Sequence, residues 1–196
     1  METARHAATE ARKAQITQAT IALLAGRGYA ATTFEAICEH AGLSSKRLIS
    51  YHFSSKDELL AAVVRKVVED AAAFMRPSLD AADGARDLLQ AYIRSNVAFI
   101  AAHPDHVRAV QQIAYNSIPL GGQERDAAIA RLVAFFDDGR RTGTFRSFDS
   151  TIMATTLRAA VDAVADRLVD GLDPELCAAE LVETFDRATR ASDSAK

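Results

Sequence analysis

Five side chains between residues 46 and 56 could bind a polyanion. Lys46 and Arg47 are adjacent, Ser50 and Tyr51 follow about one helical turn later, and Lys56 comes after a short gap. Lysine and arginine can pair with phosphates or with the acceptor edge of guanine, while a hydroxyl and a phenol add directed hydrogen bonds. This set of groups has the chemistry needed to contact duplex DNA.

These donors need a helix that presents them together, and the spacing predicts one over residues 45–52. At about 100° per residue, the side chains from Lys46 to Tyr51 cluster within roughly 140° of arc, while Leu48 and Ile49 fall on the opposite side. A charged face on a short helix is most often only a solvated surface. The DNA interpretation therefore depends on the elements around this helix.

A helix is predicted just before the charged one. Its apolar residues recur at i, i+3, i+4 and i+7, which predicts a face that belongs in a core: Phe34, Ile37, Cys38 and Ala41. Thr32 followed by Glu35 predicts a capping box at its start. Gly42 predicts its end, because glycine tolerates the positive φ of a tight turn, and Ser44 can then cap the next helix.

A second capping signal follows at Ser55 and Glu58, and it predicts a further helix starting near Lys56. Lys56 would then lie at a helix N-terminus, where backbone N–H groups and the helix dipole favour a bound phosphate. Two capping signals, a glycine turn and two opposite faces together predict a helix-turn-helix.

At these residues the sequence resembles the tetracycline-repressor family of bacterial transcription regulators, over about residues 12–64. The matching features are Gly28 followed by Thr32 and Thr33, AGLS at 41–44, YHF at 51–53 and SKDEL at 55–59. The stretch from Ala41 to Phe53 is one residue longer than the commonest family pattern. With this resemblance, the expected DNA contacts are Thr33, Ser44, Ser45, Lys46, Arg47, Ser50, Tyr51, His52 and Lys56.

Composition is that of an ordinary globular protein, with 49% hydrophobic and 25% charged residues in 196. No apolar run approaches the roughly 18 residues of a membrane span, and the N-terminus lacks the apolar core of a signal peptide. We therefore expect a cytoplasmic protein. The two cysteines, Cys38 and Cys177, have no metal-ligand spacing, so reduced thiols are expected.

The net charge of −3 is unusual for a DNA-binding protein until it is divided along the chain. Residues 1–60 carry a net charge of +1, whereas the remainder carries −4. Attraction to phosphates would have to come from local clusters, namely the donors above and Arg5, Arg12 and Lys13 near the start. Weak non-specific binding is expected.

Helical periodicity and capping residues extend over the whole chain, so the sequence predicts an all-α protein of about nine helices. An N-terminal three-helix domain is expected over residues 1–54, and a C-terminal helical domain for effector binding and dimerisation over residues 55–192. The first helix is predicted from about residue 9 to Gly26 and Gly28, and a linking helix over about 56–76, ended by Pro77. Further helices are predicted over 85–102, 104–115, 124–141, 150–169 and 174–190, with loops over 119–123 and 139–147.

The last two predicted helices carry small and apolar residues on one face each. These are Ile152, Thr156, Ala159, Ala160, Ala163 and Val164 on one helix, and Cys177, Leu181 and Phe185 on the other. In the family that the chain resembles, the final two helices pair with their copies in a four-helix dimer interface. Core packing within one subunit is the alternative explanation of the same pattern.

The resemblance also implies a small-molecule effector enclosed by the C-terminal helices. Apolar walls with a few amides and phenols are typical of such sites, and the candidates are Tyr92, Asn96, Phe99, Gln112, Tyr115, Asn116, Phe136 and Met153. The same residues equally describe a helical core with polar ends. No cofactor is predicted.

Other chemistry is less well supported by the sequence. His103 and His106 beside Asp105 could form a metal pair, but His103 is better explained as a cap before Pro104, and no metal site is predicted. No nucleophile elbow or phosphate-binding glycine loop occurs, so no catalytic residues are expected.

The leading hypothesis is a homodimeric repressor that binds an approximately palindromic DNA site and is released by the effector. The alternatives are a DNA-binding regulator without a small-molecule ligand, which is an activator or is controlled by a protein, and an all-helical enzyme.

Overall fold

The computed structural model describes residues 2–116 and 122–191, and nine helices account for most of them. The helices are α1 (Glu2–Ala31), α2 (Phe34–His40), α3 (Arg47–His52), α4 (Lys56–Asp80), α5 (Gly84–Ala102), α6 (Pro104–Asn116), α7 (Gly122–Arg141), α8 (Ser150–Val169) and α9 (Pro174–Thr189). The prediction of an all-α fold is confirmed, because extended pairing in the described chain is limited to one isolated bridge between Phe145 and Arg190. None of the described helices is long and apolar enough to cross a membrane.

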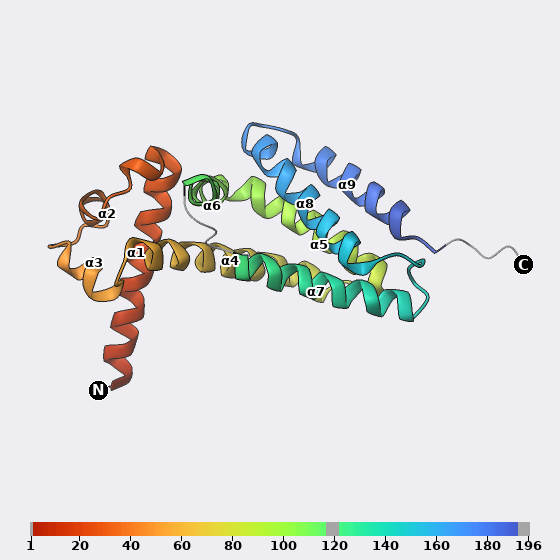
Figure 1. Cartoon of the computed structure of the whole chain (residues 1–196), viewed down its shortest axis with the longest axis horizontal. Helices are drawn as coiled ribbons and strands as arrows, with labels where there is room; N and C mark the ends of the chain where they lie inside the picture. The colour runs from red at the N-terminus through yellow and green to blue at the C-terminus, as the bar shows by residue number, and fades with distance from the viewer. Residues whose placement is uncertain (1, 117–121, 192–196) are drawn as a thin grey trace, which may run out of the picture. The chain divides into compact units, whose positions relative to one another are not determined.

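The first of two compact units contains α1, α2, α3, the start of α4, and α6 (Figure 1). It spans Met1–Glu69 and Pro104–Gly122, and within it α1 packs against α2, α3 and α6. Its helix-turn-helix core is apolar and buried: Ile16, Ala19, Leu23, Ile37, Leu43, Ile49, Phe53 and Leu59. Burial of these side chains supplies the main driving force that holds the short helices α2 and α3 in place.

The second unit contains the end of α4 with α5, α7, α8 and α9, over Asp70–His103 and Gln123–Lys196. Here α5 packs against both α8 and α9. Arg86 on α5 donates from Nε to Asp186 Oδ1 on α9 at 3.1 Å. Helix α5 is therefore the common packing partner of α8 and α9.

The division into compact units does not test the predicted functional boundary between residues 54 and 55. Helix α4 contributes to both units, and α6 lies in the first one. The boundary, and the role of residues 56–76 as a link, stay predictions.

The predicted ends of the last helices agree with the structure. Helix α8 covers residues 150–169, as predicted, and Asp149 accepts a hydrogen bond from the Ile152 N–H at its start. Gly171 has a φ of 100°, and Asp173 caps α9 through the N–H groups of its first turn. Pro174 occupies the first helical position, where its missing N–H has no consequence.

The first helix is longer than predicted, because it begins at Glu2 rather than near residue 9. The predicted end at Gly26 and Gly28 is correct in position, but the chain does not leave the helix completely there. Gly28 breaks the helix with φ 77° and ψ 175°, and a short helical segment continues to Ala31. Gln112 on α6 accepts a hydrogen bond from the Tyr29 N–H at 3.1 Å, which satisfies a donor that the break leaves without an intrahelical partner.

One other helix end and the start of one loop were predicted wrongly. Pro77 lies inside α4, which continues to Asp80, because a proline in the last turn removes only one hydrogen bond. Helix α7 ends at Arg141, as predicted, so the loop predicted over residues 139–147 wrongly included the last three residues of this helix. Phe145 explains this difference, since its N–H donates to the Gly139 carbonyl and its ring covers the glycine. Most of the predicted loop 119–123 lies outside the described residues.

Candidate DNA-binding surface

Helices α2 and α3 form a helix-turn-helix whose turn is fixed by specific bonds. Gly42 adopts φ 63° directly after α2, in the left-handed region that favours glycine. Gln15 on α1 donates to the Ala41 carbonyl at 2.7 Å, which ties the end of α2 to the first helix. The Cys38 thiol donates to the Leu43 carbonyl at 3.2 Å across the turn. The turn therefore holds α3 in a defined orientation on α1 and α2.

The starts of these helices differ from their predicted caps: the cap of α2 is one residue later, and the N-cap position of α3 is Lys46, which makes no side-chain cap bond. Thr33, not Thr32, caps α2 by accepting a hydrogen bond from the Ala36 N–H at 3.2 Å. Thr32 is fully buried, and its hydroxyl donates to the Gly28 carbonyl at 2.8 Å. A buried hydroxyl needs a partner, and the break at Gly28 provides one. Ser45, rather than Ser44, accepts from the Arg47 N–H at the start of α3.

The polar side of α3 is exposed as the spacing predicted. Lys46, Arg47, Ser50 and Tyr51 are all exposed, with Tyr51 at 74%, whereas Ile49 is fully buried in the core. His52 is half-buried, and its ring lies edge-on to that of Tyr51. An exposed row of two cations, a hydroxyl and a phenol on one short helix can reach base edges and phosphates in a major groove.

Of the two cations at the start of α3, the one at the N-cap position is paired within the protein. Lys46 Nζ lies 2.6 Å from Glu35 Oε1 on α2. This hydrogen bond lowers the pKa of the Glu35 carboxyl and raises the pKa of Lys46. Arg47 has no ion pair among the described residues, so it is the cation of α3 that is immediately available to a phosphate or a guanine.

The sequence pattern did not reveal the role of Glu35. Glu35 was assigned to a capping box, but it contacts a lysine 11 residues further on, across the turn. No helical spacing indicates such a pair, because the two residues belong to different helices.

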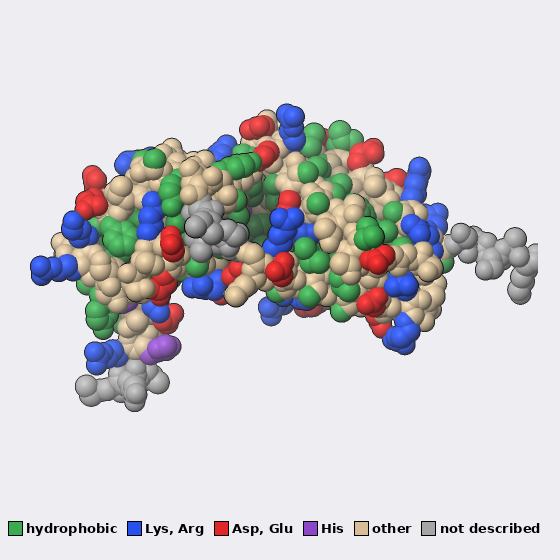
Figure 2. Space-filling model, in the orientation of Figure 1, with side chains coloured by type: hydrophobic (Ala, Val, Ile, Leu, Met, Phe, Trp, Pro, Cys, Tyr) green, Lys and Arg blue, Asp and Glu red, His purple; other side chains and the backbone are tan. Residues whose placement is uncertain are grey.

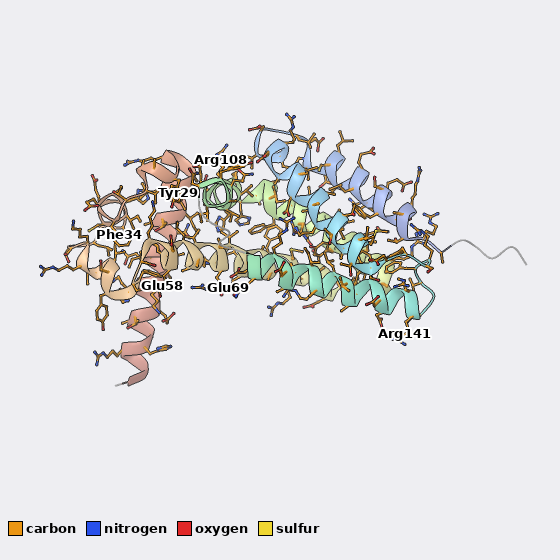
Figure 3. The ribbon with its side chains drawn as sticks, viewed as in Figure 1. Tyr29, Phe34, Glu58, Glu69, Arg108 and Arg141 are labelled. Atoms are coloured by element: carbon orange, nitrogen blue, oxygen red, sulfur yellow. The ribbon has the colours of Figure 1, made fainter. Side chains whose placement is uncertain are left out.

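The start of α4 differs from a simple capping box. Ser55 accepts from the Glu58 N–H at 3.1 Å, as predicted, but the Glu58 carboxylate accepts from the N–H and hydroxyl of Ser54 at 2.6 Å. The hydrogen bond from Ser54 lowers the pKa of Glu58. Figure 3 marks Tyr29, Phe34 and Glu58, which lie on α1, α2 and α4 of the first unit.

Lys56 is turned toward α1. Its Nζ lies 4.0 Å from the centroid of the Tyr29 ring and 3.4 Å from the Tyr29 carbonyl oxygen. The lysine is half-buried there, and a cation–π contact of this kind stabilises the junction between α1 and α4. A phosphate contact by Lys56 stays a prediction, and it would require the side chain to leave Tyr29.

Basic residues near the N-terminus also have partners inside α1. Arg12 donates to Gln15 at 2.7 Å, and Lys13 pairs with Glu10 at 3.5 Å. Figure 2 shows blue side chains beside red ones over the first unit rather than a uniform basic patch. That attraction to DNA depends on a few individual cations stays a prediction.

The predicted effector residues are divided between the two compact units. Gln112, Tyr115 and Asn116 belong to the first, and the other five belong to the second. The Gln112 side chain accepts a hydrogen bond from the Tyr29 N–H. The Asn116 amide donates to the Gln112 backbone carbonyl at 2.9 Å. Tyr115 is largely exposed. The two hydrogen bonds explain Gln112 and Asn116 structurally, and a role of all three residues toward an effector stays a prediction.

In the second unit, the five remaining candidates have different surroundings. Phe99 is buried and stacks on His103, with ring centroids 4.5 Å apart. Phe136 is fully buried in an aromatic cluster with Phe145. Asn96, also buried, donates to the Tyr92 carbonyl at 2.8 Å. Met153 is half-buried.

His103 was predicted to cap a helix, and it occupies the C-cap of α5. Its Nδ1 lies 3.1 Å from the Phe99 carbonyl oxygen. Within the described residues no group of three or more His, Cys, Asp or Glu side chains could hold a metal ion.

Comparison with known proteins relates the helix-turn-helix region to one family. Residues 16–63 match the family model of "Bacterial regulatory proteins, tetR family". The HTH-type transcriptional regulator BetI of Burkholderia thailandensis is 34% identical over 88 residues, which cover 44% of this chain and 45% of that protein. The chain thus spans less than half the length of this relative.

Two longer similarities extend into the second unit. The HTH-type transcriptional repressor SCO4008 of Streptomyces coelicolor is 32% identical over 137 residues, which cover 68% of this chain and 67% of that protein. The crystal structure of a putative transcriptional regulator from Pseudomonas aeruginosa PAO1 superposes with a TM-score of 0.76 at 26% identity, covering 91% of this chain and 90% of that one.

Proposed function

Because the chain belongs to the tetR family of bacterial regulatory proteins, we propose that it is a homodimeric repressor that leaves its operator when a small molecule binds. The exposed face of α3 carries this proposal. It presents Arg47, Ser50 and Tyr51 to solvent, while Ile49 anchors the helix in the core. This division of faces suits a helix that lies in the major groove.

In this proposal the donors on α3 contact bases, and residues around it fix the protein on the phosphates. Arg47 and Lys46 suit guanine O6 and N7, while Ser50 and Tyr51 suit either a base edge or a phosphate. Thr33 has its side-chain oxygen at the start of α2, close to the N–H groups of that helix. With Lys56 it would position the protein on the backbone.

A two-fold arrangement of this unit would bind an approximate palindrome. Two copies of α3 would enter successive major grooves about 34 to 36 Å apart. Dimerisation through α8 and α9 would fix that spacing. Such a repressor would act in the cytoplasm, where bacterial DNA lies.

Release by an effector requires a difference in affinity between two states. The effector must bind more tightly to a state in which the spacing of the two α3 helices no longer fits the operator, and DNA must prefer the other state. We expect the effector to bind the second unit, among Tyr92, Asn96, Phe99, Phe136 and Met153.

The test is to sequence the genomic fragments that the protein retains and to measure binding to the enriched site by mobility shift. The variant Arg47→Ala with Ser50→Ala should lose most of its affinity. Arg108→Ala is the matched control, since Arg108 is an exposed arginine on α6 of the same unit. Unchanged binding by the double variant would refute the assignment of α3 as the reading helix, and the absence of any enriched fragment at low salt would refute DNA binding.

A further inference from the structure

A guanidinium group is buried between α8 and α5 in the second unit. The Arg158 side chain is 17% exposed. Its Nη2 donates to Asp162 Oδ1 at 2.5 Å, and its Nη1 lies 3.4 Å from the Tyr92 hydroxyl on α5. Its third nitrogen, Nε, is buried and has no hydrogen-bond acceptor among the described residues. Buried donors are nearly always bonded in proteins, so this one needs an explanation.

The charge of Arg158 makes the need for an acceptor stronger. Burial opposes the charged form, but the contacts with Tyr92 and Asp162 outweigh it and raise the pKa of the guanidinium. The group therefore stays protonated, with a buried N–H that has no acceptor in the described part of the chain. An anionic acceptor would satisfy it better than a neutral one, because hydrogen bonds between charged groups are stronger.

Arg140 provides a comparison within the same unit. Its Nε is also buried without an acceptor among the described residues. Its Nη1, however, donates to Asp137 and Ser150 at 3.3 and 3.2 Å, and the Ser150 hydroxyl donates to Asp137 at 2.7 Å. This closed network joins the end of α7 to the start of α8 and has a clear structural role.

Arg158 lacks such a network. Asp162 accepts through one of its oxygens from a single guanidinium nitrogen. The Asp162 side chain is 50% exposed. The Nε and Nη2 groups of an arginine lie along the same edge, which matches a carboxylate in a bidentate arrangement. Asp162 occupies only half of that edge, and its exposure allows it to move aside.

We propose that Arg158, with Tyr92 beside it, is the anchor of a binding site for a small organic carboxylate. The carboxylate would accept from Nε and Nη2, and Asp162 would compete with it for the edge. That this ligand is the effector rests on the function proposed above. The site adds a charged residue to a set of candidates that had none, and it restricts the ligand to an anion.

The experiment observes the arginine Nε–H signals of the full-length protein by NMR with nitrogen-15 labelling, assigned with the variants Arg158→Gln and Arg140→Gln. The probes are butyrate, octanoate and benzoate, each compared with its primary amide, at an ionic strength kept constant with chloride. At least one carboxylate should shift the Arg158 signal saturably, while the amides and the Arg140 signal should not respond.

Two variants test the geometry. Asp162→Asn should tighten carboxylate binding severalfold, because the competing anion is gone, whereas Arg158→Gln should abolish the heat of binding in calorimetry. Arg140→Gln, the matched control, should leave it unchanged. The proposal is overturned if no carboxylate gives a saturable shift, if Arg140 responds equally, or if Arg158→Gln still binds with the same affinity.

A separate measurement distinguishes carboxylate binding at Arg158 from the proposed release of DNA by an effector. The carboxylate that binds is added to the protein on its enriched DNA fragment. Release of the DNA supports an effector role. Retention of the DNA while the Arg158 signal still shifts leaves the carboxylate site established and refutes that role for the ligand.

Discussion

In the proposed complex, the contact between Lys46 and Glu35 would determine how much positive charge α3 offers to DNA. The two side chains are exposed and 2.6 Å apart, so the pair is in contact with solvent and contributes little to folding. Its effect on binding is larger, because a phosphate has to compete with Glu35 for Lys46. Arg47 has no such competitor among the described residues. In the proposed complex, the pair would therefore lower the affinity for DNA without blocking entry of α3 into the groove.

We predict that Glu35→Gln increases affinity for the operator and makes it more dependent on salt, with a slope of log K against log salt steeper by about one. Fluorescence anisotropy over a salt series measures both quantities. Glu39→Gln is the matched control, since it removes the same charge from an exposed position on α2. An equal gain in both variants would show that net charge, not the pairing of Lys46, is responsible.

Asp186 is the carboxylate on which acid stability should depend most clearly. Its side chain is 9% exposed, and it pairs with Arg190 on its own helix and with Arg86 on α5. The hydrogen bond from Arg190, with a further one from Arg86, lowers the pKa of Asp186. A lowered pKa means that the stabilisation is complete above the unfolded value of about 3.9 and is lost as pH falls through the folded value.

We therefore predict that Asp186→Asn lowers the free energy of unfolding by about 1 to 3 kcal/mol at neutral pH. The difference from the unsubstituted protein should shrink as pH falls below about 4, and it should vanish below the lowered pKa of the folded state, where Asp186 is protonated in both states. Urea denaturation at several pH values measures this. Asp138→Asn, which alters an exposed pair with Arg141, should change stability little at any pH. A difference that stays constant down to pH 2 would contradict the assignment.

At the scale of helices, the sequence was sufficient to predict a feature wherever the residues that determine it are neighbours in the chain. The start of α9 follows from Gly171, Asp173 and Pro174 because a cap and a first-position proline act on neighbouring N–H groups. The faces of α3 follow from their spacing alone. These features could be predicted without knowledge of any distant residue.

The errors arose where a distant residue changes a local preference. Thr32 is a good capping residue, but the break at Gly28 offers it a carbonyl, and the cap moves to Thr33. The hydrogen bond of Gln112 with Tyr29, which lies 83 residues away, was not predicted either, and a role of Gln112 toward an effector stays a prediction. The unpaired Nε of Arg158 is likewise invisible in the sequence, because it depends on how α5 and α8 pack.

Gly139 shows the same dependence on tertiary packing and permits a direct test. A Cβ at this position would lie 2.2 Å from Cδ2 of the buried Phe145 ring. We predict that Gly139→Ala destabilises the protein by about 1 to 3 kcal/mol, because the ring must move. Gly26→Ala is the matched control, since a Cβ there meets nothing within 4 Å. It should stabilise the protein by about 0.5 to 1 kcal/mol. Thermal unfolding compares the two, and a neutral Gly139→Ala would contradict the packing argument.

At the scale of the whole molecule, the proposed function depends on which surface would join two copies. Some residues in the predicted interface are already used within the subunit, since Cys177 and Phe185 are buried. The outward side of α8 is different. Ile152 is 68% exposed, and Ala159 and Ala163 are exposed on the same side of the helix. Leu176 on α9 is also exposed. A surface with small and apolar residues of this kind permits close approach of a second pair of helices.

If this surface is the dimer interface, Ile152→Glu should separate the protein into monomers, because two carboxylates would be buried across the two-fold axis without partners. Light scattering coupled to gel filtration would show the change in mass. Affinity for the full palindrome should fall by roughly 100-fold or more, because binding at one half-site no longer holds a second copy of the protein near the other half-site. Binding to an isolated half-site should stay the same. Ala127→Glu places the same charge on an exposed position of α7 and should leave the dimer intact. A dimeric Ile152→Glu would place the interface elsewhere, whereas a monomer that still binds the full palindrome tightly would mean that the two copies of α3 do not act as a pair.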